Sequence, residues 1–227
     1  ERDNDRIHSV IKGSAALHGG YTPSMTAPSI KGEENVILRA WEDADIDPET
    51  IGYIEAHGTG TPLGDPIEIH SLIKAFKRHT QKQQFCVVGS AKANIGHTEG
   101  AAGIAGILKV VQQLKHKIIP ALPAFNKLNP NINIEQSALY INDSAQQWPS
   151  INGLPRRAGI SSFGFSGAYA HVVVEEYVAQ ETVTDVPAIS STNPAIIILS
   201  AKNRACLQDK VDGLLNTIID RQLSNED

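Results

Sequence analysis

Two histidines lie in glycine-rich turns that follow short apolar segments. His57 comes after the apolar residues 50–56 and precedes Gly-Thr-Gly-Thr, and His97 comes soon after the apolar residues 85–92. Such segments predict buried strands, and α/β proteins bind their ligands just beyond the carboxyl ends of their strands. A single histidine is usually structural, but two in equivalent turns, with Lys92 nearby, favour a catalytic site.

The glycines after His57 also invite comparison with a dinucleotide-binding turn. Gly58, Gly60 and Gly64 have the spacing GxGxxxG, whereas the dinucleotide fingerprint is GxGxxG. Asp65 would place negative charge where a helix N-terminus must receive a pyrophosphate. The chain has no GK[ST] triplet, so a phosphate-binding P-loop is excluded. A nicotinamide-dependent dehydrogenase is therefore a disfavoured alternative, which titration with the cofactor would test.

Strand and helix patterns alternate around these turns. Apolar residues recur on one helical face after Asp65, and Asp65 and Glu68 are suited to an N-terminal capping box around Pro66. A segment rich in alanine and glycine follows His97, which is typical of a helix packed closely between layers. We expect strands at residues 6–17, 50–56, 85–92 and in two stretches of 156–177, and helices from Glu33 to before Asp47, after Asp65 and after His97.

The composition changes after Tyr177. Residues 178–194 are polar, which is typical of a linker. Residues 195–203 then have the pattern of a strand, and residues 204–223 have that of an amphipathic helix. We therefore expect a first domain at residues 1–177, a linker at 178–194 and the start of a further, incomplete module at 195–227.

The overall composition excludes several classes of function. The 227 residues carry a net charge of -5, which provides no broad basic surface for nucleic acid. The longest apolar runs are far too short to cross a membrane. The two cysteines form no CxxC pair, which favours a reducing cytoplasm. The eight histidines form neither HxxxH nor HExxH, so no metal site is expected.

Three segments resemble the C-terminal signatures of β-ketoacyl synthases, the ketosynthase domains of modular polyketide synthases. They are EAHGTGTPLGDPIE (residues 55–68), GSAKANIGHTEGAAGIAGILK (89–109) and SSFGFSGAYAHVVVEEY (161–177). The resemblance runs in order from Arg6 to Tyr177. It implies the α/β thiolase-like fold with its five layers, α-β-α-β-α, of which this chain would hold the C-terminal half only. Residues 195–227 would begin the linker module after the ketosynthase. The residues within these motifs favour synthases whose acyltransferase is a separate protein that acts in trans.

The resemblance implies a decarboxylative Claisen condensation, in which a malonyl unit loses carbon dioxide and its enolate attacks an acyl thioester. Negative charge builds on the thioester oxygen of the malonyl unit, and hydrogen-bond donors aimed at that oxygen lower the barrier. His57 and His97 match the two family histidines with this role, and Lys92 matches the lysine that orients the site. The other implied site residues are Thr59 and Thr61, which hold the phosphopantetheine arm; Phe165, the gating residue whose backbone N–H completes an oxyanion hole; and Glu99, which supports the loop of His97.

The family's nucleophilic cysteine lies in the N-terminal half of the fold, in a Cys-Ser-Ser turn that this sequence lacks. Cys86 lies within a strand pattern and Cys206 on the last helix, so neither is placed to be activated. We therefore expect the chain by itself to be inactive. The implied partners are an acyl carrier protein, which carries the substrates on phosphopantetheine, a second copy in a homodimer, and neighbouring synthase domains. No cofactor bound directly is expected.

Several positions depart from the usual family pattern. Leu17 and Ser29 stand where asparagine is common, and Ala168-Tyr169 stands where Thr-Asn is usual beside the gating loop. The bulk of Tyr169 would reshape the acyl pocket or reduce activity. A second hypothesis is a non-elongating ketosynthase that only binds and transfers acyl chains. Such domains often lose the second histidine, so the presence of His97 favours elongation.

Overall fold

The computed structural model describes residues 5–22, 24, 27–123, 125–179 and 196–221. The chain divides into two compact units, Glu1–Val178 and Ala179–Asp227. Within the described residues, the first unit holds all of the strands and all of the site residues named above. The described residues of the second unit form one helix, α5 (Arg204–Arg221).

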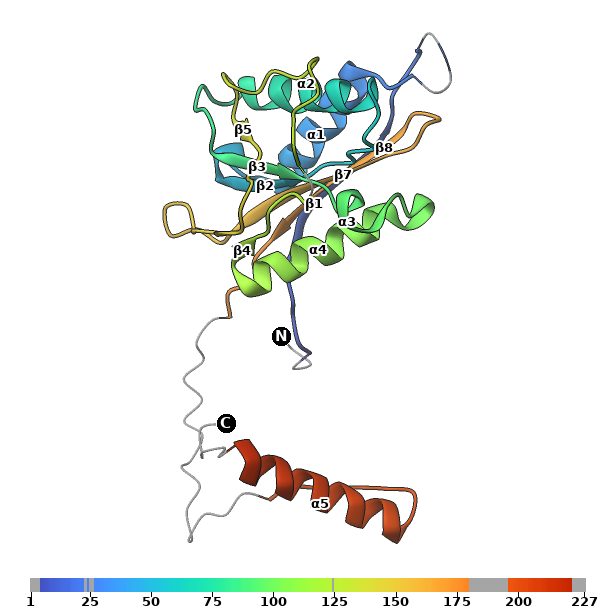
Figure 1. The fold of residues 1–227 in the computed structure, drawn as a ribbon, viewed down its shortest axis with the longest axis vertical. Helices are drawn as coiled ribbons and strands as arrows, with labels where there is room; N and C mark the ends of the chain where they lie inside the picture. The colour runs from blue at the N-terminus through green and yellow to red at the C-terminus, as the bar shows by residue number, and fades with distance from the viewer. Residues whose placement is uncertain (1–4, 23, 25–26, 124, 180–195, 222–227) are drawn as a thin grey trace. The chain divides into compact units, whose positions relative to one another are not determined.

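A six-stranded sheet forms the centre of the first unit, with the strand order β1-β8-β7-β2-β3-β5 (Figure 1). β2 pairs in parallel with β3 and β7, and β3 pairs in parallel with β5, whereas β8 is antiparallel to β1 and β7. The carboxyl ends of β2, β3 and β7 therefore meet at the same end of the sheet. The strands are β1 (Val10–His18), β2 (Ile51–Glu55), β3 (Cys86–Gly89), β5 (Leu139–Tyr140), β7 (Arg157–Phe163) and β8 (Ala168–Glu175), and β4 (Ile118–Ile119) pairs separately with β6 (Gln146–Gln147).

Helices cover both faces of this sheet (Figure 1). α1 (Ile30–Ala44) and α2 (Gly64–Lys77) lie on one face, and α4 (Ala102–His116) lies on the other. Short helices connect the longer elements: η1 (Pro48–Thr50), α3 (Lys92–Ile95) and η2 (Glu99–Ala101).

Neighbouring residues of β2 pack on opposite faces, because side chains alternate along a strand. Ile54 belongs to the apolar cluster that contains Trp41 of α1 and Phe76 of α2, whose ring centroids lie 4.8 Å apart. Tyr53 belongs to the cluster that contains Leu114 of α4. The strand that leads to His57 is therefore buried on both faces and holds the start of the next turn rigidly.

Besides the strand expected at residues 6–17, which spans Val10–His18, three further expected elements are wrong in detail. The helix expected from Glu33 begins at Ile30, because the Ser29 hydroxyl accepts a hydrogen bond from the backbone N–H of Gly32 (3.1 Å) and caps the helix. The strand expected at residues 85–92 ends at Gly89, and the chain turns into α3.

The third wrong expectation is the strand at residues 195–203. Residues 196–203 form no strand, and residue 195 lies outside the described residues. An extended segment needs a neighbouring strand to pair its backbone groups, and the described part of the second unit contains none. The helix expected after it is confirmed as α5 as far as Arg221, and residues 222–223 lie outside the described residues.

The described residues contain neither a membrane-spanning helix nor a cluster of metal-binding side chains. No helix among them combines the length and hydropathy that a bilayer crossing requires. Their histidine, cysteine and acidic side chains form no group of three or more that could hold a metal ion.

His171 of β8 makes the stability of this unit dependent on pH. The side chain is fully buried, with its Nδ1 atom 3.0 Å from the Ser161 hydroxyl, and burial lowers its pKa from 6.5 to about 3. At a pH below the pKa that this histidine has in the unfolded chain, the unfolded chain binds a proton that the folded protein does not. The free energy of unfolding therefore falls as the pH decreases. We expect this group to contribute about 1.4 kcal/mol of that loss per pH unit between about pH 6 and pH 4.

Urea unfolding at several pH values checks this expectation. The His171→Asn variant should show a smaller loss of stability per pH unit than the wild type. His116→Asn, which replaces an exposed histidine of α4, is the matched control and should keep the wild-type dependence. A His171→Asn variant with the full wild-type dependence would show that another group binds the proton.

Candidate active site

Both histidines, Lys92 and an aromatic side chain meet where β2, β3 and β7 end. The ring centroids of His57 and His97 lie 5.4 Å apart, and the rings are nearly perpendicular, at 82°. The Nζ atom of Lys92 lies 3.4 Å from Nδ1 of His57. Phe163, the last residue of β7, packs with its ring centroid 5.8 Å from that of His57. The parallel pairing of β2 with β3 and β7 brings these residues together, because it aligns the carboxyl ends of the strands.

The hydrogen bonds of the two imidazoles determine which nitrogen carries the proton. The backbone N–H of Glu99 donates to Nδ1 of His97 (2.9 Å), so this nitrogen is the acceptor and the proton lies on Nε2. An ammonium group at Lys92 can only donate, so it makes Nδ1 of His57 an acceptor in the same way. Each ring therefore keeps an Nε2–H group that is able to donate to a ligand.

The surroundings of His57 keep its ring neutral. Burial, the charge of Lys92 and the neighbouring His97 together lower the pKa of His57 from 6.5 to about 4. Burial also lowers the pKa of Lys92, and this effect is opposed by the carboxylates of Glu68 and Glu55. A neutral imidazole beside a cation is suited to donate a hydrogen bond to an oxygen on which negative charge develops.

Two carboxylates of α2 hold the turn that follows His57. The Oε1 and Oε2 atoms of Glu68 accept hydrogen bonds from the backbone N–H groups of His57 (2.7 Å) and Gly58 (2.8 Å). The Oδ1 atom of Asp65 accepts from the backbone N–H of Gly60 (3.0 Å). The capping box expected for Asp65 and Glu68 is therefore wrong: α2 begins at Gly64 without a side-chain cap, and both carboxylates bind the preceding turn instead. Burial raises the pKa of Glu68 to about 7.

Gly58 is required by this geometry. Its backbone has φ 49°, in the left-handed region, and a Cβ atom there would lie 2.8 Å from the Cβ of Ser90. The turn therefore packs directly against the turn that carries Lys92, and the two site loops support each other.

A cavity of about 680 Å³ opens at this site. The residues that line it come from five segments of the chain, and they include Pro28, Glu33, His57, Thr59, Thr61, His97, Glu99, Phe163, Phe165 and Tyr169. A second cavity of about 840 Å³ shares Thr59, Glu68 and His97 with the first. It is also lined by Lys92 and, farther along the chain, by Leu122, Phe125 and residues 127–132. The structure therefore brings together all of the site residues expected from the sequence.

The expected binding and gating residues lie at the mouth of the site. The hydroxyl oxygens of Thr59 and Thr61 lie 3.1 Å apart, within hydrogen-bond distance. Phe165 is 73% exposed on the turn between β7 and β8. That turn is attached to the end of β1, because the backbone N–H of Gly19 donates to the carbonyl of Gly167 (2.7 Å). Glu99 supports His97 through its backbone N–H, for which it adopts φ 50°.

Two buried carboxylates of this region, Glu33 and Glu55, carried no functional prediction from the sequence. Glu33 of α1 lines the cavity, and burial together with Glu68 raises its pKa to about 8. Glu55 ends the apolar strand β2 and pairs with Lys109 of α4. The sequence does contain a signal for Glu55: it is an acidic residue within an otherwise apolar strand, and an acidic residue is rarely buried without a partner.

Tyr169 occupies a space that two glycines leave open. Its hydroxyl accepts a hydrogen bond from the backbone N–H of Ser29 (3.0 Å), and its ring centroid lies 5.1 Å from that of Phe163. A Cβ atom at Gly19 or Gly32 would come within 2.4 Å or 2.9 Å of the ring. Tyr169 is therefore a packed residue of the cavity wall, 3% exposed, that joins the end of β1, the start of α1 and β8.

We expect Tyr169→Ala to lower the free energy of unfolding by roughly 3–5 kcal/mol, as for other buried aromatic side chains replaced by alanine. Tyr169→Phe keeps the ring and loses one hydrogen bond, so its cost should be about 1 kcal/mol. Chemical denaturation of the three proteins checks both values. Equal losses in the two variants would mean that the hydroxyl, and not the ring, stabilises this corner.

Comparisons with known proteins agree with this arrangement. Residues 8–126 match the family described as "Beta-ketoacyl synthase, C-terminal domain", and residues 129–225 match "Ketoacyl-synthetase C-terminal extension". Polyketide synthase PksL of Bacillus subtilis (strain 168) is 46% identical over 225 residues, which are 95% of this chain and 5% of that protein. Polyketide synthase PksM of the same organism is 48% identical over 218 residues, again 5% of its length. The chain thus spans about a twentieth of these relatives.

Solved structures give the same result. The ketosynthase from module 6 of the bacillaene synthase of Bacillus subtilis 168 superposes with a TM-score of 0.80 at 38% identity, over 98% of this chain and 37% of that one. Ketosynthase twelve of the bacillaene polyketide synthase in Bacillus amyloliquefaciens has a TM-score of 0.75 at 42% identity, over 78% of this chain and 32% of that one. The chain belongs to the β-ketoacyl synthase family, and its first unit is the C-terminal part of the thiolase-like ketosynthase fold.

Proposed function

We propose that this chain supplies the decarboxylating side of a polyketide synthase ketosynthase. The complete domain would join an acyl chain to a malonyl unit, with both substrates carried on acyl carrier protein. The observation that supports this proposal is the pair of imidazoles, 5.4 Å apart, whose Nδ1 atoms already accept hydrogen bonds. Two Nε2–H donors are thereby left for one oxygen.

In the proposed reaction, the bond between the malonyl carboxylate and its methylene carbon breaks and carbon dioxide leaves. The electron pair of that bond forms an enolate, whose charge lies largely on the thioester oxygen. His57 and His97 donate hydrogen bonds to this oxygen, which lowers the barrier to decarboxylation. The enolate carbon then attacks the acyl thioester held on a cysteine of the other half of the domain. The cysteine thiolate leaves, and a β-ketoacyl thioester on the carrier protein is formed.

The remaining residues of the cavity would bind and gate. Thr59 and Thr61 offer two neighbouring hydroxyls to the amide groups of the phosphopantetheine arm. Phe165, exposed on its turn, would close over the site and offer its backbone N–H to the oxygen of the acyl thioester. We further propose a cytoplasmic homodimer that works beside other synthase domains and with an acyltransferase supplied in trans, without a cofactor of its own.

The test uses the complete ketosynthase domain, which is this chain joined to its other half. The domain is acylated from an acyl carrier protein, malonyl carrier protein is added, and the carrier-bound products are identified by mass spectrometry. We expect loss of carbon dioxide and a β-ketoacyl carrier product. Acyl transfer without decarboxylation would instead support the non-elongating alternative, and reduction of a nicotinamide cofactor would support a dehydrogenase.

A further inference from the structure

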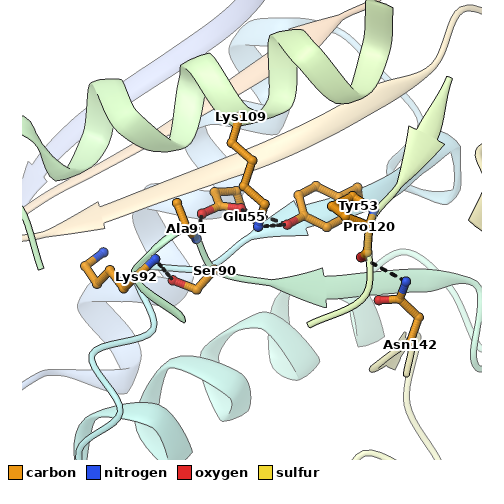
Figure 2. A network of polar contacts seen from close by, with 8 residues as sticks. All are labelled: Tyr53, Glu55, Ser90, Ala91, Lys92, Lys109, Pro120 and Asn142. Atoms are coloured by element: carbon orange, nitrogen blue, oxygen red, sulfur yellow. Dashed lines mark hydrogen bonds and ion pairs between the residues drawn. The ribbon is translucent and has the colours of Figure 1, made fainter. Parts of the chain in front are cut away.

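A buried polar network lies between the sheet and α4, behind the site. Tyr53 and Glu55 extend from β2 toward Lys109 of α4 (Figure 2). The Nζ atom of Lys109 lies 2.9 Å from Oε2 of Glu55 and 2.8 Å from the Tyr53 hydroxyl. The Tyr53 hydroxyl in turn donates to the same Glu55 oxygen (2.7 Å). The Glu55 side chain is 3% exposed and that of Lys109 is 19% exposed.

The other oxygen of Glu55 reaches the turn that carries Lys92. Oε1 accepts a hydrogen bond from the backbone N–H of Ala91, the residue before Lys92 (Figure 2). Lys92 also donates its backbone N–H to the Ser90 hydroxyl (3.3 Å). From this backbone position the Lys92 side chain extends to Nδ1 of His57. One carboxylate thus connects the α4 network to the residue that sets the tautomer of His57.

The surroundings of Glu55 compensate for the burial of its carboxylate. Taking a carboxylate out of water is costly unless it is paired and hydrogen-bonded, and the two oxygens of Glu55 have three donors. α4 approaches closely enough to supply Lys109, because Gly106 has no side chain: a Cβ atom there would lie 3.0 Å from Cγ of Glu55. The negative charge also favours the protonated form of Lys92 and thereby raises its pKa, against the effect of burial.

We propose that Glu55 is a positioning residue for decarboxylation, which holds the Ala91–Lys92 turn so that the Lys92 side chain stays on His57. Lys109 and Tyr53 orient its carboxylate. This inference rests on the proposed function. Glu55 itself has no access to the substrate; it acts through Lys92.

The experiment is a double-mutant cycle in the complete ketosynthase domain, with Glu55→Gln and Lys92→Met singly and together. The amide introduced by Glu55→Gln would keep the shape of the side chain but lose the charge and one acceptor. We expect this variant to lower the rate constant of malonyl decarboxylation by up to about a hundredfold, because a small displacement of a catalytic group has effects of that size. The acylation rate of the nucleophile should change little. The double variant should decarboxylate no more slowly than Lys92→Met alone, because both substitutions act on the same interaction, that of the Lys92 side chain with His57.

A matched control separates positioning from stability. Glu176 forms a comparable, mostly buried ion pair with Arg156 (2.6 Å), away from the site. Glu176→Gln should leave decarboxylation unchanged in both the wild-type and the Lys92→Met background. Tyr53→Phe removes one hydroxyl from the network, and like Glu55→Gln it should lower the rate of decarboxylation. If Glu55→Gln does not fold, Tyr53→Phe takes its place in the experiment.

The outcomes are distinguishable. A wild-type domain that does not decarboxylate malonyl carrier protein overturns the proposed function. A wild-type domain that does so, with Glu55→Gln or Tyr53→Phe equally fast, overturns the positioning role. Effects of Glu55→Gln and Lys92→Met that multiply in the double variant also overturn it, since Glu55 would then act independently of Lys92.

Discussion

Replacing His57 or His97 by alanine in the complete ketosynthase domain is expected to lower malonyl decarboxylation and condensation about a hundred- to a thousandfold. This is the usual cost of removing one hydrogen-bond donor from an oxyanion, roughly 2.7–4 kcal/mol. Both rings keep an Nε2–H group free because their Nδ1 atoms are occupied, by Lys92 for His57 and by the backbone of Glu99 for His97. The ring centroids lie 5.4 Å apart, which is close enough for both donors to reach one ligand atom.

The same substitutions should affect acylation of the nucleophile far less, because in the proposed reaction that step uses the other half of the domain. The double variant should lose less than the product of the single losses, since the two donors serve one charge. Mass spectrometry of the carrier-bound intermediates measures acylation and decarboxylation separately. The control is His116→Ala, which replaces an exposed histidine of α4. If His97→Ala decarboxylates at the wild-type rate, His97 is structural and the domain is better described as non-elongating.

The chain of 227 residues by itself is expected to form no acyl-enzyme when it is incubated with an acyl carrier thioester. Cys86 is fully buried on β3, and burial raises the pKa of its thiol, so it is neither accessible nor ionised. Cys206 is exposed on α5 of the second unit, whereas all of the expected site residues belong to the first unit. Efficient acyl transfer needs an accessible thiol that belongs to the site that binds the thioester, so neither cysteine should react at a useful rate.

Intact-protein mass spectrometry detects the acyl group directly. The complete ketosynthase domain, treated in parallel, is the positive control and should gain one acyl group. Variants Cys86→Ser and Cys206→Ser of the isolated chain identify the site if any label appears. Acylation of the isolated chain at either cysteine, at the rate of the complete domain, would refute the assignment of the nucleophile to the other half.

Much of the architecture around the site was predictable from local patterns. The apolar run at residues 50–56 and the amphipathic stretch after Asp65 are confirmed as β2 and α2, because strand and helix periods are properties of neighbouring residues. The strand expected at residues 195–203 is wrong for residues 196–203 for the same reason: the composition suits a strand, but a strand also needs a partner, which no local pattern reveals.

The sequence by itself determined that His57 and His97 follow two strands in glycine-rich turns, with Lys92 nearby. Tertiary structure alone decided what each side chain binds. The spacing of Asp65 and Glu68 suited a capping box, yet both carboxylates hold the backbone of the His57 turn, which folds back over the start of α2.

The link between Glu55 and Lys109, 54 residues apart, likewise had no local signature. The physical reason is that some interactions join residues close in the chain, whereas others join residues far apart in the chain. Backbone periodicity is decided within a few residues, whereas the partner of a buried charge is decided by which elements pack together. In this chain the tautomer of His57 follows from such a distant partner, Lys92, whereas that of His97 follows from the nearby backbone of Glu99.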